Sequence, residues 1–380
     1  MRVLVRIGAA APAATTGWLA ALLWLCPGAG CDAPAAPSPS PSPEPVNALE
    51  DYAPGAAPLL EVNSRLLRRF APLRTVIAAD PGTITEPITT LGRTLFFDPR
   101  LSKDQDLSCN SCHKLASYGV DNKRFSPGHR GQLTARNTPS VFNAAAYTYQ
   151  FWDARAEKVE DQIRGPLFSP REMAMTDEAS VTAVVRSIPG YRTLFQRAFP
   201  AQLDPITFVN ITTALGAFER RLTTPGRWDR YLMGDKSALT HEEKAGLRTF
   251  TSLGCMVCHT GEVLGAGMLE KVGVVKSWPN QSDQGRYELT KAPADRMMFK
   301  VPTLRNVAET APYFHDGSAE DLPTAVRLMA SHQLGIDASP GETAAVVSWL
   351  KALTGPLPED YIVRPALPAS GPKTPAPVPY

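Results

Sequence analysis

The sequence has no block of lysine and arginine and no hydrophobic run long enough to span a membrane. Its 380 residues include 39 basic and 37 acidic side chains, so the formal net charge is only +2. Nucleic-acid-binding domains usually carry a clustered basic surface, and this balance therefore argues against a nucleic-acid partner. The length predicts two or three domains, each large enough to bury a core.

The most apolar stretch lies at the N-terminus and is short. Arg2 and Arg6 precede the segment GWLAALLWL, whereas a spanning helix needs about 20 apolar residues. This pattern predicts a signal peptide over residues 1–31 and export to the periplasm. Small residues before Cys31 resemble a lipoprotein processing site, but Gly28 stands where leucine is usual. Lipidation of Cys31, which would give a membrane anchor, and plain cleavage nearby are therefore both open.

Cysteine is scarce, and its placement is informative. Six cysteines are present; two lie in or beside the predicted signal peptide, and four belong to two C-x-x-C-H patterns, Cys109-Cys112-His113 and Cys255-Cys258-His259. A C-x-x-C pair alone could be a redox dithiol or half of a zinc site, but the adjacent histidine is typical of c-type haem attachment. The sequence therefore predicts two covalently bound c-type haems, with His113 and His259 as the proximal iron ligands.

The pattern between the two termini is helical, with many turns and no run of alternating strands. Asp204 and Pro205 predict a helix start, and apolar residues then recur at helical spacing at Phe208, Ile211, Leu215, Phe218 and Leu222. Two more helix starts are predicted by capping pairs, Thr240 with Glu243 and Ser339 with Glu342. Gly355 is expected to end the last of these helices.

These signals predict a mostly α protein with two cytochrome c-like helical domains, each holding one haem. The sequence TTPGRW interrupts the helical pattern near residue 225 and indicates the domain junction. The expected organisation is a signal peptide at 1–31, a Pro/Ser/Ala-rich linker at 32–60, an N-terminal haem domain at 61–225, a C-terminal haem domain at 226–363, and a Pro-rich tail at 364–380. The tail is expected to be loose, at least at its end.

The function of each haem depends on the sixth iron ligand, because a permanently six-coordinate haem carries electrons, whereas one that opens a position can bind a small molecule. His129 lies in the Gly/Pro-rich segment SPGHRGQ after the first motif. Such a loop could place the imidazole on iron and later withdraw it, although a loop histidine is more often simply solvated.

Several segments together resemble the bacterial di-haem cytochrome c peroxidases in order and spacing. The resemblance covers roughly residues 75–360 and is carried by LGRTLFFDPRLS, LSCNSCHKL, SPGHRGQLTARNTPSVFNAAAYTYQFWDAR, GPLFSPREM, VPTLRNVAETAPYFHDGS and RLMASHQLG. In that family the N-terminal haem reacts with peroxide and the C-terminal haem transfers electrons. The resemblance thus implies a peroxidase that reduces hydrogen peroxide to water.

The resemblance also implies roles for particular residues. His129 matches the displaceable sixth ligand of the first haem, and Met329 matches the methionine ligand of the second, with His332 as a rival. Glu172 matches the acid–base group at the peroxide site and Gln162 its polar neighbour. Trp152 matches the indole between the haems. Asn137, Thr310 and Pro312 match the ligands of a calcium ion, for which an amide oxygen and main-chain carbonyls are reasonable.

The implied electron donor is a small cytochrome c or a blue-copper protein, and a homodimer is one arrangement that the family adopts. Two other functions stay open. One is a pure electron carrier, with both haems permanently six-coordinate. The other is a related branch that oxidises residues of a partner protein to form a tryptophan-derived quinone. In that branch a tyrosine replaces the methionine ligand, so Met329 and the loop around His129 favour the peroxidase.

Overall fold

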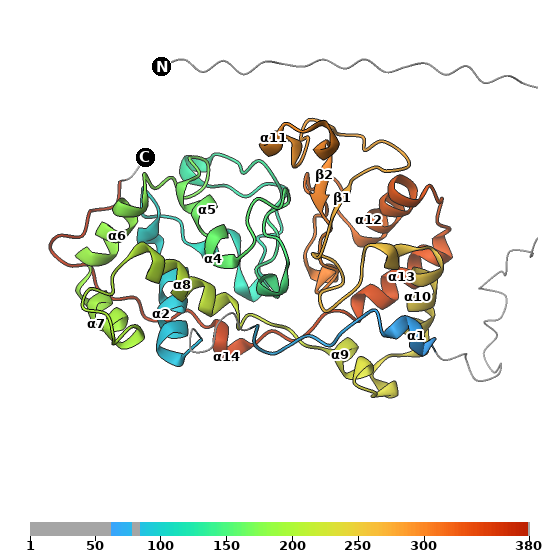
Figure 1. Cartoon of the computed structure of the whole chain (residues 1–380), viewed down its shortest axis with the longest axis horizontal. Helices are drawn as coiled ribbons and strands as arrows, with labels where there is room; N and C mark the ends of the chain where they lie inside the picture. Colours follow the sequence, from blue (N-terminus) through green and yellow to red (C-terminus); the bar gives the residue numbers. More distant parts are fainter. Residues whose placement is uncertain (1–61, 78–83, 379–380) are drawn as a thin grey trace, which may run out of the picture. The chain divides into compact units, whose positions relative to one another are not determined.

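The computed structural model describes residues 62–77 and 84–378. The predicted signal peptide, Cys31 and the linker at 32–60 lie outside these residues. The described part is rich in short helices and contains one two-stranded sheet (Figure 1), so the expectation of a mostly helical protein is confirmed. Within the same ranges, no helix is both long and apolar enough to cross a membrane.

Seven helices of the described residues have eight or more residues: α2 (Glu86–Phe96), α6 (Glu178–Ser187), α7 (Pro189–Ala198), α8 (Phe208–Glu219), α10 (His241–Ser252), α12 (Leu322–Met329) and α13 (Pro340–Lys351). The shorter ones are α1 (Ser64–Leu67), α3 (Cys109–Cys112), α4 (Val159–Gln162), α5 (Arg164–Phe168), α9 (Arg227–Leu232), α11 (Tyr287–Thr290) and α14 (Glu359–Ile362). A π-helical turn follows α12 at Ala330–Leu334. Strands β1 (Leu269–Lys271) and β2 (Met298–Lys300) pair antiparallel, with Glu270 opposite Phe299.

The first hydrophobic cluster is built around the contact of α2 with α8, which lie side by side in Figure 1. The apolar residues predicted on the α8 segment are all buried: Phe208, Ile211, Leu215, Phe218 and Leu222. Gly92 of α2 sits where a Cβ atom would lie 1.9 Å from the carbonyl oxygen of Ala214. Glycine at this position therefore allows the two helix backbones to approach closely.

The predicted start of α8 is wrong by three residues. The helix begins after Thr207, whose side chain accepts a hydrogen bond from the N–H of Asn210 at 3.2 Å. Asp204 instead accepts a hydrogen bond from Arg186 at 2.7 Å, and the carbonyl of Pro205 accepts one from the Asn210 side chain at 2.7 Å. A cap that looked suitable locally is thus drawn into contacts with another segment.

The second hydrophobic cluster is built around the contact of α10 with α13. The capping pairs predicted for these helices, Thr240–Glu243 and Ser339–Glu342, are confirmed. Gly355, however, does not end α13, because the helix already stops at Lys351. A Cβ atom at Gly355 would lie 1.9 Å from the carbonyl oxygen of Thr224, so the glycine permits close backbone contact instead.

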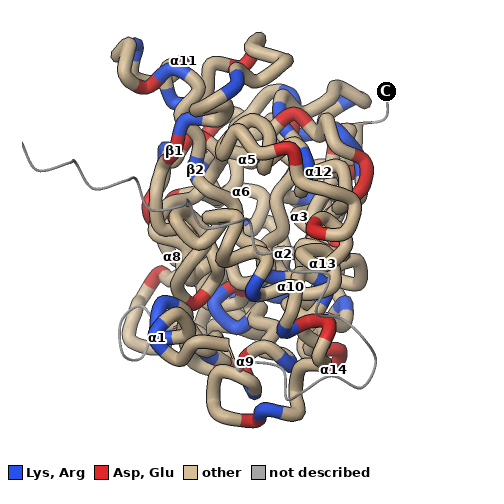
Figure 2. The backbone as a smooth tube through the Cα atoms, turned by 90° about the vertical axis from the view of Figure 1, so that its right-hand side faces the viewer, with Lys and Arg blue, Asp and Glu red and all other residues tan. Residues whose placement is uncertain are grey.

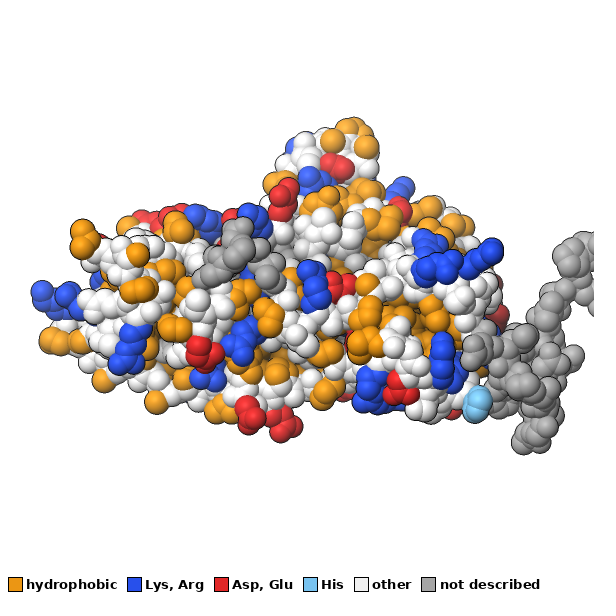
Figure 3. Space-filling view, turned by 60° about the horizontal axis from the view of Figure 1, so that its bottom comes forward, with side chains coloured by type: hydrophobic (Ala, Val, Ile, Leu, Met, Phe, Trp, Pro, Cys, Tyr) orange, Lys and Arg blue, Asp and Glu red, His pale blue; other side chains and the backbone are white. Residues whose placement is uncertain are grey.

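The N-terminal end of the described chain packs against the second hydrophobic cluster, and its C-terminal end packs against the first. Phe70 packs edge-on against Trp228, with ring centroids 5.3 Å apart, while Tyr361 packs against Phe218 at 5.1 Å. The division into domains at residue 225 stays a prediction. Basic and acidic residues are interspersed over the backbone trace (Figure 2), and apolar and charged side chains are mixed on the face seen in Figure 3.

The Pro-rich tail is not loose over its described part. Ser370 accepts a hydrogen bond from Arg100 at 3.0 Å, and the carbonyl of Pro375 accepts one from Gln105 at 2.8 Å. Thr374 donates to the carbonyl of Ser187 at 3.1 Å. The tail lacks regular secondary structure but is held by side chains of the first half of the chain, which the expectation of a loose tail did not foresee.

Candidate active site

The first C-x-x-C-H motif is presented by the single helical turn α3. Ser108 caps this turn, and its N–H donates a hydrogen bond to the hydroxyl oxygen of Ser111 at 3.0 Å. His113 follows immediately, and its Nδ1 atom lies 3.3 Å from the carbonyl oxygen of Gly119. Burial lowers the pKa of His113. A neutral imidazole anchored through Nδ1 keeps Nε2 for a metal, which is the usual arrangement of a ligating histidine.

The motif forms one wall of a cavity of about 70 Å³. Most of its lining is apolar, from Phe96, Leu101, Leu107, Val141, Ile163, Pro166, Leu167, Met173 and Leu215. Cys109, Cys112 and His113 also line it, and the motif cysteines form no disulfide in the described part of the chain. Two thiols, one imidazole and apolar walls fit a covalently attached haem.

Two polar residues predicted for the peroxide site line the same cavity. Gln162 is the last residue of α4, and Glu172 lies in the turn after α5. Burial raises the pKa of Glu172, and a hydrogen bond from Ser169 and the charge of Arg155 partly offset this effect. The cavity therefore brings an amide and a carboxyl group of raised pKa to the motif that would hold the haem.

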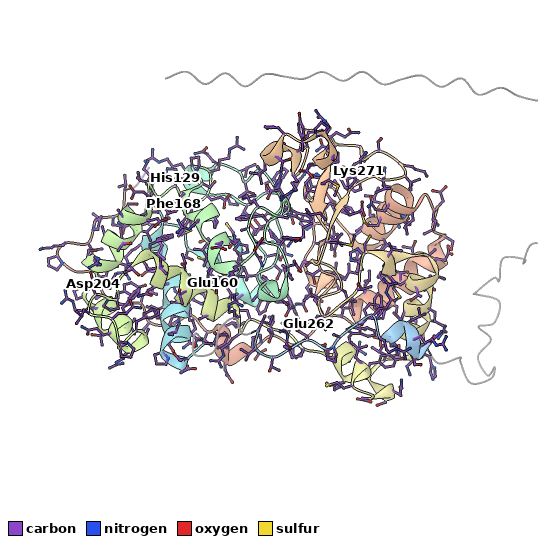
Figure 4. The ribbon with its side chains drawn as sticks, in the orientation of Figure 1. His129, Glu160, Phe168, Asp204, Glu262 and Lys271 are labelled. Carbon is purple, nitrogen blue, oxygen red and sulfur yellow. The ribbon has the colours of Figure 1, made fainter. Side chains whose placement is uncertain are left out.

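The loop of His129 is tied to the turn that carries Glu172. The N–H of His129 donates to the carbonyl oxygens of Arg171 at 3.1 Å and Glu172 at 2.8 Å. Gly128 lines the cavity, and a Cβ atom there would lie 2.0 Å from the Arg171 carbonyl oxygen. Figure 4 shows His129 in the same part of the molecule as Phe168, the last residue of α5.

The side chain of His129 faces a carboxylate that sequence reasoning missed. Its Nδ1 atom lies 3.4 Å from Oδ2 of Asp104, and the same oxygen accepts a hydrogen bond from Nε of Arg130 at 2.9 Å. Asp104 is buried, and its other oxygen has no hydrogen-bond partner among the described residues. The structure thus places His129 against Asp104, whereas Gly128 faces the cavity.

Trp152 links the two halves of the described chain. Its Nε1 atom donates to the carbonyl oxygen of Asn137 at 2.9 Å, and its own carbonyl oxygen accepts from the N–H of Lys300 in β2 at 2.7 Å. Its ring lies edge-on to that of His315, with centroids 6.3 Å apart. Trp152 is thus held between the segment that follows the first motif and the sheet that follows the second.

The residues matched to calcium lie on segments that hydrogen bonds connect. The side-chain nitrogen of Asn137 donates to the carbonyl of Lys123 at 2.9 Å. Asn122 donates to the carbonyl of Ala311, between Thr310 and Pro312, at 3.1 Å. No group of three or more His, Cys, Asp or Glu side chains that could hold a metal ion occurs in the described ranges. A site here would therefore rest on an amide oxygen and main-chain carbonyls.

The second motif follows α10. Cys255 begins a 3-10 turn after Gly254, which has a positive φ of 92°, and Nδ1 of His259 lies 3.0 Å from the carbonyl oxygen of Leu264. Burial lowers the pKa of His259. Both motif histidines are therefore anchored through Nδ1 to a main-chain carbonyl.

Met329 and its rival His332 both approach one aromatic cluster. Met329 packs against the cluster of Trp278, Met297 and Phe299. The ring of His332 lies edge-on to Trp278 at 5.1 Å, and its Nδ1 atom lies 3.0 Å from the carbonyl oxygen of Lys276. The packing does not separate the two candidates for the sixth ligand of the second haem.

A second carboxyl group in the cavity was also missed. Glu219 is the last residue of α8 and lines the cavity together with Glu172. The signal is present in the sequence, since Ile211, Leu215 and Glu219 are four residues apart and share one face of the helix. A carboxyl group on an otherwise apolar face predicts either a buried partner or a functional site.

Comparisons with known proteins agree with this arrangement. The family model described as "Di-haem cytochrome c peroxidase" matches residues 86–237. Cytochrome c551 peroxidase of Nitrosomonas europaea is 42% identical over 311 residues, covering 81% of this chain and 91% of that protein. Cytochrome c551 peroxidase of Pseudomonas aeruginosa is 42% identical over 300 residues, covering 77% and 86%.

A solved structure supports the fold. The crystal structure of a MauG-like protein associated with microbial copper homeostasis superposes with a TM-score of 0.67 at 29% sequence identity, covering 78% of this chain and 95% of that one. The chain therefore belongs to the di-haem cytochrome c peroxidase family.

Proposed function

We propose that this protein is a peroxidase that reduces hydrogen peroxide to two waters with electrons from a small donor protein. The observation that carries the proposal is the cavity in which the first C-x-x-C-H motif meets Gln162 and Glu172. The relatives named cytochrome c551 peroxidase support the same reaction.

Two c-type haems are the cofactors that the residues suit. Cys109 and Cys112 would form the thioethers of the first and His113 its iron ligand; the second motif, with Met329, would hold the other. Bound haem supplies an iron that can bind a peroxide oxygen and accept electrons one at a time. In this proposal the two helical haem domains meet near residue 225.

Glu172 carries the proton chemistry in the first cavity. Its carboxylate accepts a proton from one peroxide oxygen and returns it to the other, so that water leaves as the oxygen–oxygen bond breaks. Because burial raises its pKa, the carboxylate accepts a proton more readily than an exposed carboxylate does. Gln162 supplies an amide that can orient the peroxide by hydrogen bonds.

We infer that Trp152 connects the two sites. Its hydrogen bond to Asn137 and the hydrogen bond that its carbonyl receives from Lys300 fix the indole between the two halves. We assign it to the electron path from the second haem to the first. A calcium ion at Asn137, Thr310 and Pro312 would stiffen this junction.

The donor is a small cytochrome c or a blue-copper protein, and the enzyme works in the periplasm after removal of residues 1–31. Cys31 is the candidate for a lipid anchor. The alternative function is oxidation of residues in a partner protein, and the similarity to the MauG-like structure is the observation that supports it. Met329 at the end of α12 favours the peroxidase, because a tyrosine takes this place in the partner-oxidising branch.

The test is steady-state oxidation of a reduced small c-type cytochrome by hydrogen peroxide, with spectra of both haems before and after partial reduction. We expect peroxide-dependent turnover and two spectrally distinct haems. Failure to turn over peroxide with any reduced cytochrome or blue-copper donor, together with two haems that remain six-coordinate in every redox state, would mean that the protein only carries electrons. A slow covalent change in a partner protein, without such turnover, would favour the alternative.

A further inference from the structure

Glu219 is a buried carboxyl group that the proposed chemistry does not yet use. It is 6% exposed and lines the cavity of the first motif together with Gln162 and Glu172. The charge of Glu219 contributes to the raised pKa of Cys109, so the carboxyl group lies near the first cysteine of the motif. Among the described residues, none donates a hydrogen bond to its carboxyl oxygens or forms an ion pair with them.

The charged groups around Glu219 leave it without a cation. Arg220, the next residue, points away and forms two hydrogen bonds to Glu160 of α4, at 2.9 and 3.0 Å, and one to the carbonyl of Ile77. Figure 4 shows Glu160 beside this part of α8. From α2, Arg93 turns to the Tyr361 carbonyl, and Glu86 pairs with Arg221.

A carboxyl group in this setting holds its proton. Removing an ion from water is costly unless a partner compensates for the lost hydration. Burial, with the nearby negative charge of Glu160, raises the pKa of Glu219 to about 8, against the opposing charge of Arg220. Glu172 differs, because Ser169 and Arg155 both favour its ionised form. Burial shifts both carboxyl groups of the cavity towards the protonated form, and the hydrogen bond that opposes this shift at Glu172 has no counterpart at Glu219.

We propose that Glu219 stores a proton in the first cavity and, in each turnover, gives it to the peroxide oxygen that remains after the first water has left, as the donor electrons reduce that oxygen to the second water. Reduction of one hydrogen peroxide to two waters consumes two electrons and two protons. Glu172 only moves a proton between the two peroxide oxygens and adds none. The donor protein supplies the electrons, Glu219 supplies one of the two protons from inside the protein, and solvent then reprotonates it. This inference rests on the proposed peroxidase function.

The first test needs no turnover. Infrared difference spectra of the holoenzyme between pH 6 and pH 10 should contain a protonated-carboxyl band that disappears with a midpoint near 8 and is missing in Glu219→Gln. The matched control is Glu157→Gln, which removes an exposed carboxylate just before α4 and should leave the band unchanged. The same band in Glu219→Gln as in the wild type would overturn the proposal.

The second test follows kcat with pH. The wild type should lose kcat as pH rises through the midpoint of that band. Glu219→Gln should lose this decline and show a kcat at neutral pH lower by roughly 10²-fold, the lower end of the usual loss of a proton-transfer group. Glu160→Gln removes the charge that favours the proton on Glu219 and leaves Arg220 unpaired, so it should move the midpoint to lower pH. Glu219→Asp should restore a pH-dependent decline and provides the comparison if Glu219→Gln does not fold.

The outcomes distinguish a failure of the Glu219 proposal from a failure of the proposed peroxidase function. A wild type that turns over peroxide, with the same kcat and pH profile in Glu219→Gln, would remove Glu219 from the reaction and leave the peroxidase function intact. A wild type that does not turn over peroxide contradicts the proposed function itself, whatever the infrared spectra contain.

Discussion

The imidazole of His129 faces the carboxylate of Asp104, with Nδ1 3.4 Å from Oδ2. Both side chains are buried, and Arg130 binds the same carboxylate oxygen. His129 is the residue matched to the displaceable ligand of the first haem, yet its neighbour Gly128 lines the cavity. We therefore expect Asp104 to hold the side chain of His129 away from the cavity.

Replacing Glu172 by glutamine should affect chemistry and leave haem binding intact. The amide preserves the shape of the side chain but cannot accept and return a proton. Peroxidase turnover should fall by roughly 10²–10⁴, the usual scale for the loss of an acid–base group, while both haem spectra stay nearly unchanged. Steady-state kinetics with a reduced cytochrome measure the loss. Turnover close to that of the wild type would exclude Glu172 from the mechanism.

Met329→His should lower the reduction potential of the second haem. Imidazole donates more strongly to iron than a thioether does, and therefore stabilises the oxidised state. Haem content should stay normal while electron uptake from the donor slows. Redox titration of the second haem measures the change, and His332→Gln is the matched control because its side chain approaches the same tryptophan, Trp278. If the potential shifts in His332→Gln and not in Met329→His, the ligand assignment reverses.

Glu219→Gln should change how stability depends on pH. The pKa of Glu219 is raised by burial from 4.5 to about 8 in the folded protein. Between these values the folded state binds one more proton than the unfolded chain, so the free energy of unfolding of the wild type falls as pH rises from about 4.5 to 8.

The slope of that fall is roughly 1.4 kcal/mol per pH unit while the difference of one proton persists. The glutamine variant lacks this ionisable group, so its free energy of unfolding relative to the wild type should increase by up to about 4 kcal/mol between pH 4.5 and pH 8. Urea unfolding at several pH values between 4.5 and 8 measures the difference. A difference that stays constant with pH would mean that Glu219 ionises in the folded protein much as it does in the unfolded chain.

The sequence predicted correctly those features that depend on interactions between residues close together in the chain. The capping pairs Thr240–Glu243 and Ser339–Glu342 formed as expected, because both partners lie in one helical turn. The start of α8 was mispredicted because Arg186, eighteen residues earlier, binds the expected cap Asp204. The packing of the Pro-rich tail depends on Arg100 and Gln105, which no local pattern connects to it.

The candidate site divides in the same way. Its motif residues and their matches to a family could be named from the sequence, and the fold brings Gln162 and Glu172 to the first motif. The contact of Asp104 with His129 joins residues 25 positions apart across a loop, and no periodicity encodes it. Glu219 was readable as a carboxyl group on an apolar helix face, but its lack of a cation depends on Glu160 taking Arg220.

The contact between Asp104 and His129 predicts the behaviour of the loop. If Asp104 holds His129 out of the cavity, Asp104→Asn should weaken that hold and let the imidazole spend more time over the first haem site. The fully oxidised variant should then react with peroxide more slowly, by roughly tenfold, since a hydrogen bond to a charged group contributes about 1.5–3 kcal/mol and this contact is long. Rapid mixing of oxidised protein with peroxide measures the rate.

His129→Gly, combined with Asp104→Asn, gives a double-mutant cycle that tests this prediction. Without the imidazole the loop lacks the histidine that could bind the iron, so the oxidised variant should react with peroxide without delay, at a rate that prior half-reduction does not change. Because Asp104 acts only through His129, the double variant Asp104→Asn/His129→Gly should react as fast as His129→Gly alone. A double variant as slow as Asp104→Asn would mean that Asp104 supports the cavity by another route, through Arg130 for example. Equal rates in the wild type and in all three variants would mean that His129 does not reach the iron in either redox state.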